Sequence, residues 1–464
     1  MTSSMVFQSI HPYDQQLVAE YPTMDDTSLQ RRIEIASQGF TVWKRTSFQQ
    51  RADLLKRLAT LLQSHRDEYA RLITMEMGKI LREAQAEIDK CATACSFYAE
   101  YGESYVRKEV LEERHMLPDM HVGYVVFEPL GVILAIMPWN FPFWQVFRCA
   151  VPSVMAGNTV VLKHAPNVTG CALAIERLFN EAGAPEGVFQ ALVVDNDTVE
   201  RIIAHDAIQG VALTGSECAG ASVASLAGKY IKRSVLELGG SDPLIVLDDA
   251  DLEQAATVAV QSRMQNAGQS CIASKRFIVH AAVYDDFVYR IQQKISALKQ
   301  GNPFDNTVTT GPMARIDLAE KLAMQVRITK QQGGELLIGS IDTLHTGANF
   351  APSLIVNAPQ ESPAFREELF GPVAVVVKAA SEQEAVYLAN ASRYGLGASI
   401  WTQDRERGQH IARQIEAGSV FINGLVKSTP QLPFGGIKKS GYGRELSYFG
   451  MKEFMNAKTV YVCR

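Results

Sequence analysis

Two side chains suited to carbonyl chemistry lie within one stretch of the chain. Cys271 ends the run Gly268-Gln269-Ser270-Cys271, and Glu237 precedes Leu238-Gly239-Gly240. A cysteine thiolate adds readily to a carbonyl carbon, and a carboxylate can activate water against a thioester. The pair therefore predicts attack on an aldehyde carbon, departure of hydride and hydrolysis of the thioester to an acid.

Each of the two residues also has a simpler interpretation. A lone cysteine is more often a buried, inert side chain, and a glutamate at a strand end is often a surface residue. The partners of Cys271 favour the nucleophile, and burial at the end of an apolar strand should raise the pKa of Glu237 toward that of a useful base. For the other six cysteines we expect the inert interpretation: Cys91, Cys95, Cys149, Cys171, Cys218 and Cys463.

Asn140 is a candidate donor to an oxyanion. It lies in Pro138-Trp139-Asn140-Phe141-Pro142, directly after a predicted strand. A side-chain amide there, together with the backbone N–H of Cys271, could stabilise the negative oxygen formed when the thiolate adds, and such a donor contributes about 3–4 kcal/mol. The alternative is an ordinary turn asparagine.

A nucleotide site is indicated by weaker signals. The dinucleotide fingerprint GxGxxG does not follow any predicted strand, but Gly215 and Gly220 open a predicted helix after a strand, where N–H groups and the helix dipole can face a phosphate. Lys163 ends another predicted strand and could bind ribose hydroxyls or a phosphate. Both features could also be plain structural ones.

The rest of the chain predicts the elements that position these residues. Helical spacing runs from 28 to 101, and an extended run at 121–128 stands apart. Strands then alternate with helices, which predicts an α/β protein whose parallel sheets bind ligands at the carboxyl ends of their strands. The expected strands are 132–136, 159–162, 188–194, 211–213, 244–247, 277–279, 373–377, 398–401, 419–422 and 458–462; the helices are 144–155, 170–181, 216–228, 251–265 and 282–299; and loops are expected at 301–312 and 332–349.

Composition excludes several classes of protein. The chain has 464 residues, 47% of them hydrophobic, and a formal charge of −5. Two large domains are expected at this length. We find no basic patch for nucleic acid, no signal peptide, no run of about 18 apolar residues that could span a membrane, and no paired cysteine spacing for a metal. A cytoplasmic protein without a metal site is expected.

Taken together, the motifs resemble the aldehyde dehydrogenase superfamily over nearly the whole chain. Six segments occur in the family's order: 138–142, 213–216, 236–240, 268–271, 367–372 and 433–436. The resemblance implies a Rossmann-like cofactor domain, a catalytic α/β domain and a small β arm that forms dimers or tetramers. We expect these at 1–117 with 131–236, at 237–440, and at 118–130 with 441–464.

The resemblance also implies roles for individual residues. Cys271 would be the nucleophile, Glu237 the base for deacylation and Asn140 the oxyanion donor. An NAD or NADP site would include Trp139, Lys163, Gly215, Ser216, Gly220, Leu238, Gly239, Glu368 and Phe370.

Within the superfamily the chain looks most like bacterial succinate-semialdehyde dehydrogenases. Arg148 falls where that group has an arginine for the substrate's distal carboxylate, and a guanidinium fork suits a carboxylate; the alternative is an arginine paired with an acidic neighbour. Gln265 stands where many members have a second arginine, with Arg263 nearby. Carboxylate binding is therefore expected from Arg148 with the hydroxyls of Ser428 or Thr429.

Three further expectations concern specificity. Pro166 replaces a glutamate that would repel the 2′-phosphate of NADP, so NADP should be accepted and NAD is possible. Ala273 replaces a second cysteine found in some relatives, so no redox disulfide with Cys271 is expected. The alternatives left open are glutarate semialdehyde or uncharged aldehydes as substrates, a CoA-acylating enzyme, and a dinucleotide-binding protein without turnover.

Overall fold

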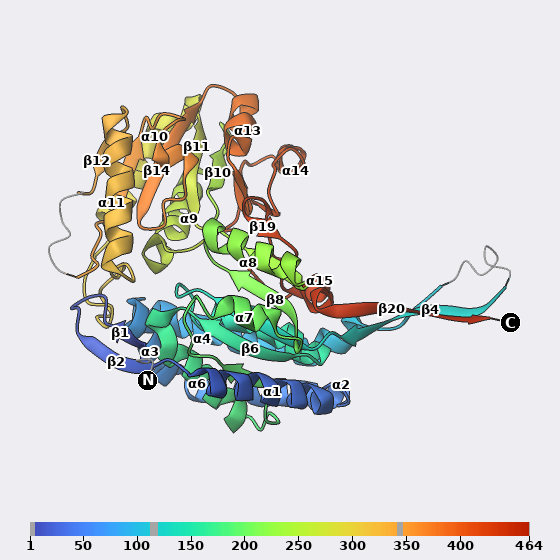
Figure 1. Cartoon of the computed structure of the whole chain (residues 1–464). Coiled ribbons are helices and arrows are strands. Elements are labelled where there is room, and N and C mark those ends of the chain that lie inside the picture. The colour runs from blue at the N-terminus through green and yellow to red at the C-terminus, as the bar shows by residue number, and fades with distance from the viewer. Residues whose placement is uncertain (1–4, 112–118, 341–346, 464) are drawn as a thin grey trace.

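Two mainly parallel sheets, each covered by helices, form the body of the protein (Figure 1). The structure is a computed structural model that describes residues 5–111, 119–340 and 347–463. Residues 112–118 and 341–346, which hold one predicted domain boundary and part of the loop predicted at 332–349, lie outside these ranges. The α/β fold expected from the alternating pattern is confirmed.

The first sheet has the order β19-β9-β8-β5-β6-β7. Its central strands are near-continuous apolar runs, as is typical of parallel strands covered on both faces. The strands are β5 (Val132–Met137), β6 (Thr159–His164), β7 (Phe189–Ala191), β8 (Ile208–Thr214), β9 (Arg233–Glu237) and the antiparallel β19 (Gly441–Tyr442). The crossover helices are α5 (Trp144–Ala156), α6 (Thr169–Glu181), α7 (Val199–Ala204) and α8 (Glu217–Lys229), with the 3-10 turn η2 (Pro166–Val168).

The predicted helical opening segment is confirmed as four helices: α1 (Asp26–Trp43), α2 (Phe48–Ser64), α3 (Arg66–Met77) and α4 (Leu81–Tyr105). The buried face of α4 packs against α2, α3 and α5, which joins it to the core of the first sheet. A hairpin that the sequence did not predict, β1 (Val6–Ile10) and β2 (Leu17–Pro22), precedes these helices.

The second sheet has the order β12-β13-β14-β11-β10-β16-β17. All its strands are parallel except β12 (Glu335–Ile338), an edge strand that lies within the predicted loop 332–349 and corrects that prediction. The others are β10 (Asp242–Val246), β11 (Ser274–His280), β13 (Ser353–Val356), β14 (Val373–Ala379), β16 (Gly397–Trp401) and β17 (Ser419–Ile422). Its helices are α9 (Leu252–Met264), α10 (Tyr284–Ser296), α11 (Ile316–Gln331), α12 (Pro363–Arg366), α13 (Glu382–Asn390) and α14 (Arg405–Ala412), with turns η3 (Gln265–Gly268) and η4 (Ala281–Val283) and the small pair β15 (Tyr394–Gly395) and β18 (Ile437–Lys438).

A long β arm extends from the body (Figure 1). Strand β20 (Met455–Cys463) pairs antiparallel with β4 (Met120–Pro129), and β3 (Glu109–Val110) adds to the other edge of β4. The C-terminal strand therefore finds its partner in the isolated strand predicted at 121–128. The structure differs from the predicted domain boundaries in two places. Strand β19 and helix α15 (Ser447–Glu453), predicted in the arm, pack on the body, and β3, predicted in the cofactor domain, lies in the arm. The rest of the domain division stays a prediction.

Candidate active site

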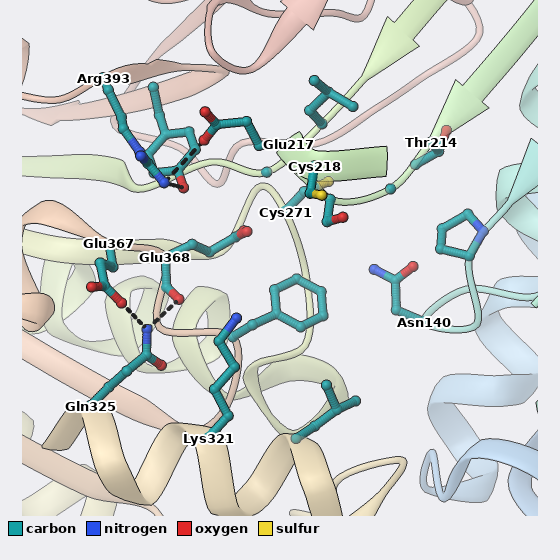
Figure 2. Close-up of a pocket in the computed structure, with 18 of the residues that line it drawn as sticks. Asn140, Thr214, Glu217, Cys218, Cys271, Lys321, Gln325, Glu367, Glu368 and Arg393 are labelled. Atoms are coloured by element: carbon teal, nitrogen blue, oxygen red, sulfur yellow. Dashed lines mark hydrogen bonds and ion pairs between the residues drawn. The ribbon is translucent and has the colours of Figure 1, made fainter. Parts of the chain in front are cut away.

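A cavity of about 930 Å³ lies between the two sheets (Figure 2). One wall is formed by the carboxyl ends of β5, β8 and β9 and by the start of α8, and the facing wall is formed by α11 and the segments around 366–370 and 391–394. The loop that ends at Cys271 closes the inner end. Ligand binding at strand carboxyl ends is the expectation for such sheets.

Backbone geometry brings Cys271 into the cavity. The three residues Asn266, Ala267 and Gly268 have φ values of 54°, 51° and 73°, which turn the chain sharply after α9. A Cβ on Gly268 would lie 2.2 Å from the carbonyl oxygen of Gly371, so only glycine fits there. Cys271 lines the cavity and is partly exposed, as a nucleophile must be.

The nucleophile loop is held by a buried lysine. Lys275 donates from Nζ to the carbonyl oxygens of Ser270 (2.8 Å), Cys271 (2.7 Å) and Ala273 (3.2 Å), and it lies 3.4 Å from Oε1 of Glu368. Burial raises the pKa of the Cys271 thiol to about 11, while the charges of Arg148 and Lys275 act to lower it. The thiol is therefore protonated at neutral pH, and these two cations favour loss of its proton.

Asn140 lies in the cavity beside the loop that ends at Cys271. It lines the cavity, is 4% exposed, and its Nδ2 donates to the carbonyl oxygen of Gln269 at 3.1 Å. Asn266 donates from Nδ2 to the Asn140 carbonyl at 2.7 Å, which anchors the segment. An amide nitrogen has two hydrogens, so one N–H of Asn140 remains for an oxyanion formed beside Cys271.

Glu237 ends β9, buried behind the cavity wall. Its side chain is 2% exposed, and neither carboxylate oxygen has a hydrogen-bond partner within the described residues. A Cβ on Gly435 would lie 2.7 Å from Oε1, so the glycine of the segment 433–436 leaves room for this carboxylate. Burial raises the pKa of Glu237 well above its ordinary value, with Arg148 opposing and Glu445 adding to the rise.

Seven of the nine residues expected at the cofactor line the cavity: Trp139, Gly215, Ser216, Leu238, Gly239, Glu368 and Phe370. Gly220 does not line it; a Cβ there would lie 2.6 Å from Leu238, so this glycine lets α8 pack close to the sheet. Lys163 is also outside the lining, buried at the end of β6 with 4% exposure. Its pKa is lowered by burial, and only Asp195 acts against that shift.

The lining residues fit a dinucleotide. Ser216 caps α8 by accepting from the N–H of Ala219 at 3.2 Å, and the lining residues Gly215, Ser216 and Glu217 show that this helix begins at the cavity. Glu368 accepts from the N–H of Gly240 at 3.1 Å, and a Cβ on Gly239 would lie 2.3 Å from its Oε2. Trp139 and Phe370 meet edge to face at 5.8 Å, giving flat apolar surfaces beside the nucleophile.

The predicted substrate residues are placed differently from one another. Arg148 is 1% exposed, forms an ion pair with Glu445, donates to Oγ1 of Thr214 at 3.2 Å and lies over the ring of Phe434. The structure thus favours the alternative interpretation, an arginine committed to an acidic residue. Ser428 is buried, and its hydroxyl accepts from Nζ of Lys90 at 2.9 Å and from Nε1 of Trp144 at 3.0 Å.

Thr429 does not support its predicted role, because its hydroxyl donates to the side chain of Gln431. Gln265 is exposed at the end of α9. Arg263 does not replace the missing second arginine, since its guanidinium donates to the buried carbonyl groups of Gly268, Leu369 and Gly371.

Several residues at the site were not predicted from sequence. Lys275 follows Cys271 by four positions, and this proximity was the available signal. Gln325 donates to Glu367 at 2.7 Å, and Arg393 pairs with Glu217 at 3.0 Å; all four residues line the cavity (Figure 2). Such pairs join distant segments, so nothing in the local sequence marks them. Cys218 lines the cavity and is exposed. Cys463 is also exposed, so two of the other six cysteines are not buried as the inert interpretation expects.

Comparison with known proteins agrees with this geometry. The model of the aldehyde dehydrogenase family matches residues 1–460. The chain belongs to the aldehyde dehydrogenase family. It is 47% identical to a probable succinate-semialdehyde dehydrogenase [NADP(+)] of Synechocystis sp., covering 99% of this chain and 100% of that protein. It is 44% identical to the succinate semialdehyde dehydrogenase [NAD(P)+] Sad of Escherichia coli, covering 98% and 97%.

Solved structures of the family superpose closely on the chain. The succinic semialdehyde dehydrogenase of Streptococcus pyogenes, in complex with NADP+ as the cofactor, matches with a TM-score of 0.95 at 38% identity, covering 99% of this chain and 100% of that one. Within the described ranges, no helix has the length and apolar character needed to cross a membrane. The same ranges contain no cluster of three or more metal-ligating side chains.

Proposed function

We propose that this aldehyde dehydrogenase oxidises succinate semialdehyde to succinate with NADP or NAD as the hydride acceptor. The observation that carries the proposal is the meeting of Cys271 and Asn140 in one cavity, with Glu237 buried behind it. The substrate is suggested by relatives named succinate-semialdehyde dehydrogenases at 43–47% identity over almost the whole chain.

The proposed cycle assigns one task to each residue. Cys271, deprotonated under the influence of Arg148 and Lys275, adds to the aldehyde carbon, and the new oxyanion accepts from the free N–H of Asn140 and from the backbone N–H of Cys271. A bound nicotinamide dinucleotide supplies the acceptor for the hydride. The thioester left on Cys271 is then hydrolysed by a water molecule that gives up its proton to Glu237.

The residues that would hold the dinucleotide are those of the cavity wall. The start of α8, with Gly215 and Ser216, would bind the pyrophosphate, and Glu368 would bind the nicotinamide ribose beside Phe370. Lys163 would lie at the adenosine ribose. Because Pro166 places no carboxylate at the start of η2, nothing there would repel a 2′-phosphate, and acceptance of NADP follows.

The alternatives have less support. A CoA-acylating enzyme needs the thioester to survive until CoA arrives, and a buried base such as Glu237 would hydrolyse it. Glutarate semialdehyde differs by one methylene, which a carboxylate subsite alone discriminates weakly. A dinucleotide-binding protein without turnover would not need Cys271, Asn140 and Glu237 together.

Assembly and location are part of the proposal. The arm presents exposed apolar side chains, including Val110, Tyr461 and Val462, on strands that have left the body of the protein. Such strands are suited to pairing with another copy, so we propose a homodimer or homotetramer. We also propose a cytoplasmic enzyme that binds neither nucleic acid nor membrane.

The test is oxidation of succinate semialdehyde by the purified protein, followed by the absorbance of the reduced cofactor. Wild-type protein should turn over with NADP in the absence of CoA, and Cys271→Ala should be inactive while still binding the dinucleotide. Activity retained by Cys271→Ala would reject the nucleophile. A strict requirement for CoA would favour the acylating alternative.

A further inference from the structure

His164 lies at the end of β6 and touches both ends of the oxyanion segment, residues 138–142, which carries Asn140. The side chain is 6% exposed and does not line the cavity. Its Nε2 lies 2.9 Å from the carbonyl oxygen of Pro142, and its Nδ1 lies 3.1 Å from that of Met137. The imidazole is therefore placed to set how the oxyanion segment lies.

The hydrogen-bond partners of His164 fix its tautomer. A carbonyl oxygen can only accept, so Nε2 must carry the hydrogen and donate to Pro142. Nδ1 accepts from the backbone N–H of Ala165 at 2.9 Å, which requires an Nδ1 without a hydrogen. Burial lowers the pKa of His164 to about 4, against the opposing effect of the two carbonyl groups. The ring is therefore neutral at neutral pH and donates to Pro142.

The Pro142 carbonyl depends on this donor because the helix that follows does not supply one. The N–H groups of Gln145 and Phe147 each donate to the carbonyl four positions earlier, at 3.0 and 2.9 Å. In the part of the chain that the structure describes, the N–H of Val146 makes no such bond to Pro142. An α-helix would normally form that bond. His164 therefore takes its place, and without the imidazole a buried carbonyl would lose its donor.

The peptide group between Pro142 and Phe143 is held at both of its polar atoms. Its N–H donates to Oε1 of Glu87 at 2.8 Å, and the same oxygen accepts from the N–H of Trp144 at 3.0 Å. Its carbonyl accepts from His164. One bond thus ties this peptide to α4 and the other ties it to the first sheet. Removing the bond to His164 would let the peptide pivot about its bond to Glu87.

Such a pivot would reach Asn140, which lies two residues before Pro142. The ring of Pro142 fixes φ, so only ψ at this residue can absorb a shift of the peptide, and part of the displacement passes into the oxyanion segment. Asn140 donates to the carbonyl oxygen of Gln269 at 3.1 Å and has one N–H left for an oxyanion. A displacement of about 1 Å in such a group can cost about a hundredfold in rate.

We propose that His164 is a positioning residue, which holds the Pro142 carbonyl so that the amide of Asn140 stays aimed at the oxyanion. It acts through Asn140 and touches neither the aldehyde nor the dinucleotide, since it does not line the cavity. The inference rests on the proposed function, because it assumes that Asn140 binds the oxyanion. Lys163, the preceding residue of β6, is proposed at the adenosine ribose, so binding of the dinucleotide has to be measured separately.

Two amide side chains give a matched pair of variants. The Nε2 of glutamine can take the place of the imidazole Nε2, so His164→Gln keeps a donor for Pro142. Asparagine is shorter by one methylene and does not reach that carbonyl, so His164→Asn loses the bond. His164→Leu removes both nitrogens and is a second loss variant, so that poor folding of one does not decide the result. The control is His11→Asn, because His11 is also buried, at 5% exposure, and does not line the cavity.

The measurements are kcat and KM for succinate semialdehyde, the dissociation constant of NADP and the melting temperature of every protein. His164→Asn and His164→Leu should lower kcat by about ten- to a hundredfold while the dissociation constant of NADP stays at the wild-type value. His164→Gln should keep most of kcat, and His11→Asn should keep all of it. A role in packing alone would not be rescued by glutamine and would not separate kcat from KM.

A double-mutant cycle with Asn140→Ala tests whether His164 acts through Asn140. Once the amide is gone there is no donor left to misplace, so His164→Asn and His164→Leu should lower kcat little further in that background. Equal losses in the two backgrounds would show that His164 acts by another route. A raised dissociation constant of NADP that accounts for the loss would place the effect at Lys163 and overturn the proposal.

The outcomes separate the positioning role from the proposed function. Wild-type kcat in Asn140→Ala would overturn the oxyanion assignment and the role of His164 with it. If Asn140→Ala loses activity but both loss variants of His164 keep wild-type kcat, the positioning role is wrong and the proposed function stands. A loss in His164→Gln as large as that in His164→Asn would reject the bond to Pro142 as the cause. A loss that is rescued by glutamine and absent without Asn140 supports the proposal.

Discussion

Replacing Asn140 by alanine should remove catalysis while leaving the fold nearly intact. Among the residues that the structure describes, Nδ2 of Asn140 makes a single hydrogen bond, to the carbonyl oxygen of Gln269 at 3.1 Å. That oxygen keeps a second donor at 3.1 Å, Nδ2 of Asn266, so the substitution leaves no buried carbonyl without a partner. The structural loss is therefore one ordinary hydrogen bond, about 0.5–1.5 kcal/mol.

The catalytic loss should be much larger. Removing one oxyanion donor from a preorganised site costs about 2.7–4 kcal/mol, or about a hundred- to a thousandfold in kcat. Asn140→Asp keeps the size of the side chain but replaces the donor by a negative charge facing the oxyanion, so it should lose at least as much. Both variants should melt within a few degrees of the wild type.

The assay measures kcat for succinate semialdehyde at saturating cofactor, with thermal melting of the same samples. A fall in kcat of less than about tenfold in Asn140→Ala, with an unchanged melting temperature, would refute the oxyanion assignment. Loss of activity that is matched by a large drop in melting temperature would show instead that Asn140 holds the nucleophile loop in place.

Three other predictions address the base, the cofactor and the buried ion pair. Glu237→Gln should accumulate acyl-enzyme after a burst of reduced cofactor. Because burial raises the pKa of Glu237, the fraction of Glu237 in its base form grows as pH rises, so deacylation by the wild type should accelerate with pH. The variant should lose this pH dependence, and an unchanged pH profile would contradict the assignment of Glu237 as the base. Pro166→Glu should lower the ratio of kcat/KM with NADP to kcat/KM with NAD by about tenfold or more. A wild-type enzyme whose kcat/KM with NAD exceeds that with NADP by more than about a hundredfold, roughly 2.7 kcal/mol, would contradict the cofactor proposal. Arg148→Met should lower the free energy of unfolding by about 3–5 kcal/mol, because it leaves Glu445 buried and unpaired. The double variant with Glu445→Gln should recover much of this loss. Additive losses of the two single variants in chemical denaturation would argue against the pair.

The sheets could be predicted from sequence because parallel strands covered on both faces are apolar throughout. Strands β5, β6 and β11 are buried at nearly every position, and each was expected. The edge strand β12 was missed, since Glu335–Ile338 is short, partly exposed and has glycines on both sides. The hairpin of β1 and β2 was missed because its connection carries no two-residue turn signal, and its strands pair mainly with each other.

Local sequence motifs were enough to identify the candidate residues of the site that would act on ligands. Cys271, Glu237 and Asn140 each lie at a strand end or a sharp turn, and such positions follow from local patterns. What the sequence could not supply is the set of partners. The pairing of Arg148 with Glu445, and of Lys90 with Ser428, joins segments far apart in the chain, so only the packing of α4, α5 and the C-terminal segments reveals it.

These partners decide what the catalytic groups do. Burial raises the pKa of both the Cys271 thiol and the Glu237 carboxyl, to about 11 for the thiol. The charges that oppose this come from fixed residues: Arg148 acts on both groups and Lys275 acts on the thiol. A change that removes either charge should therefore slow formation of the thiolate even though it touches no substrate atom.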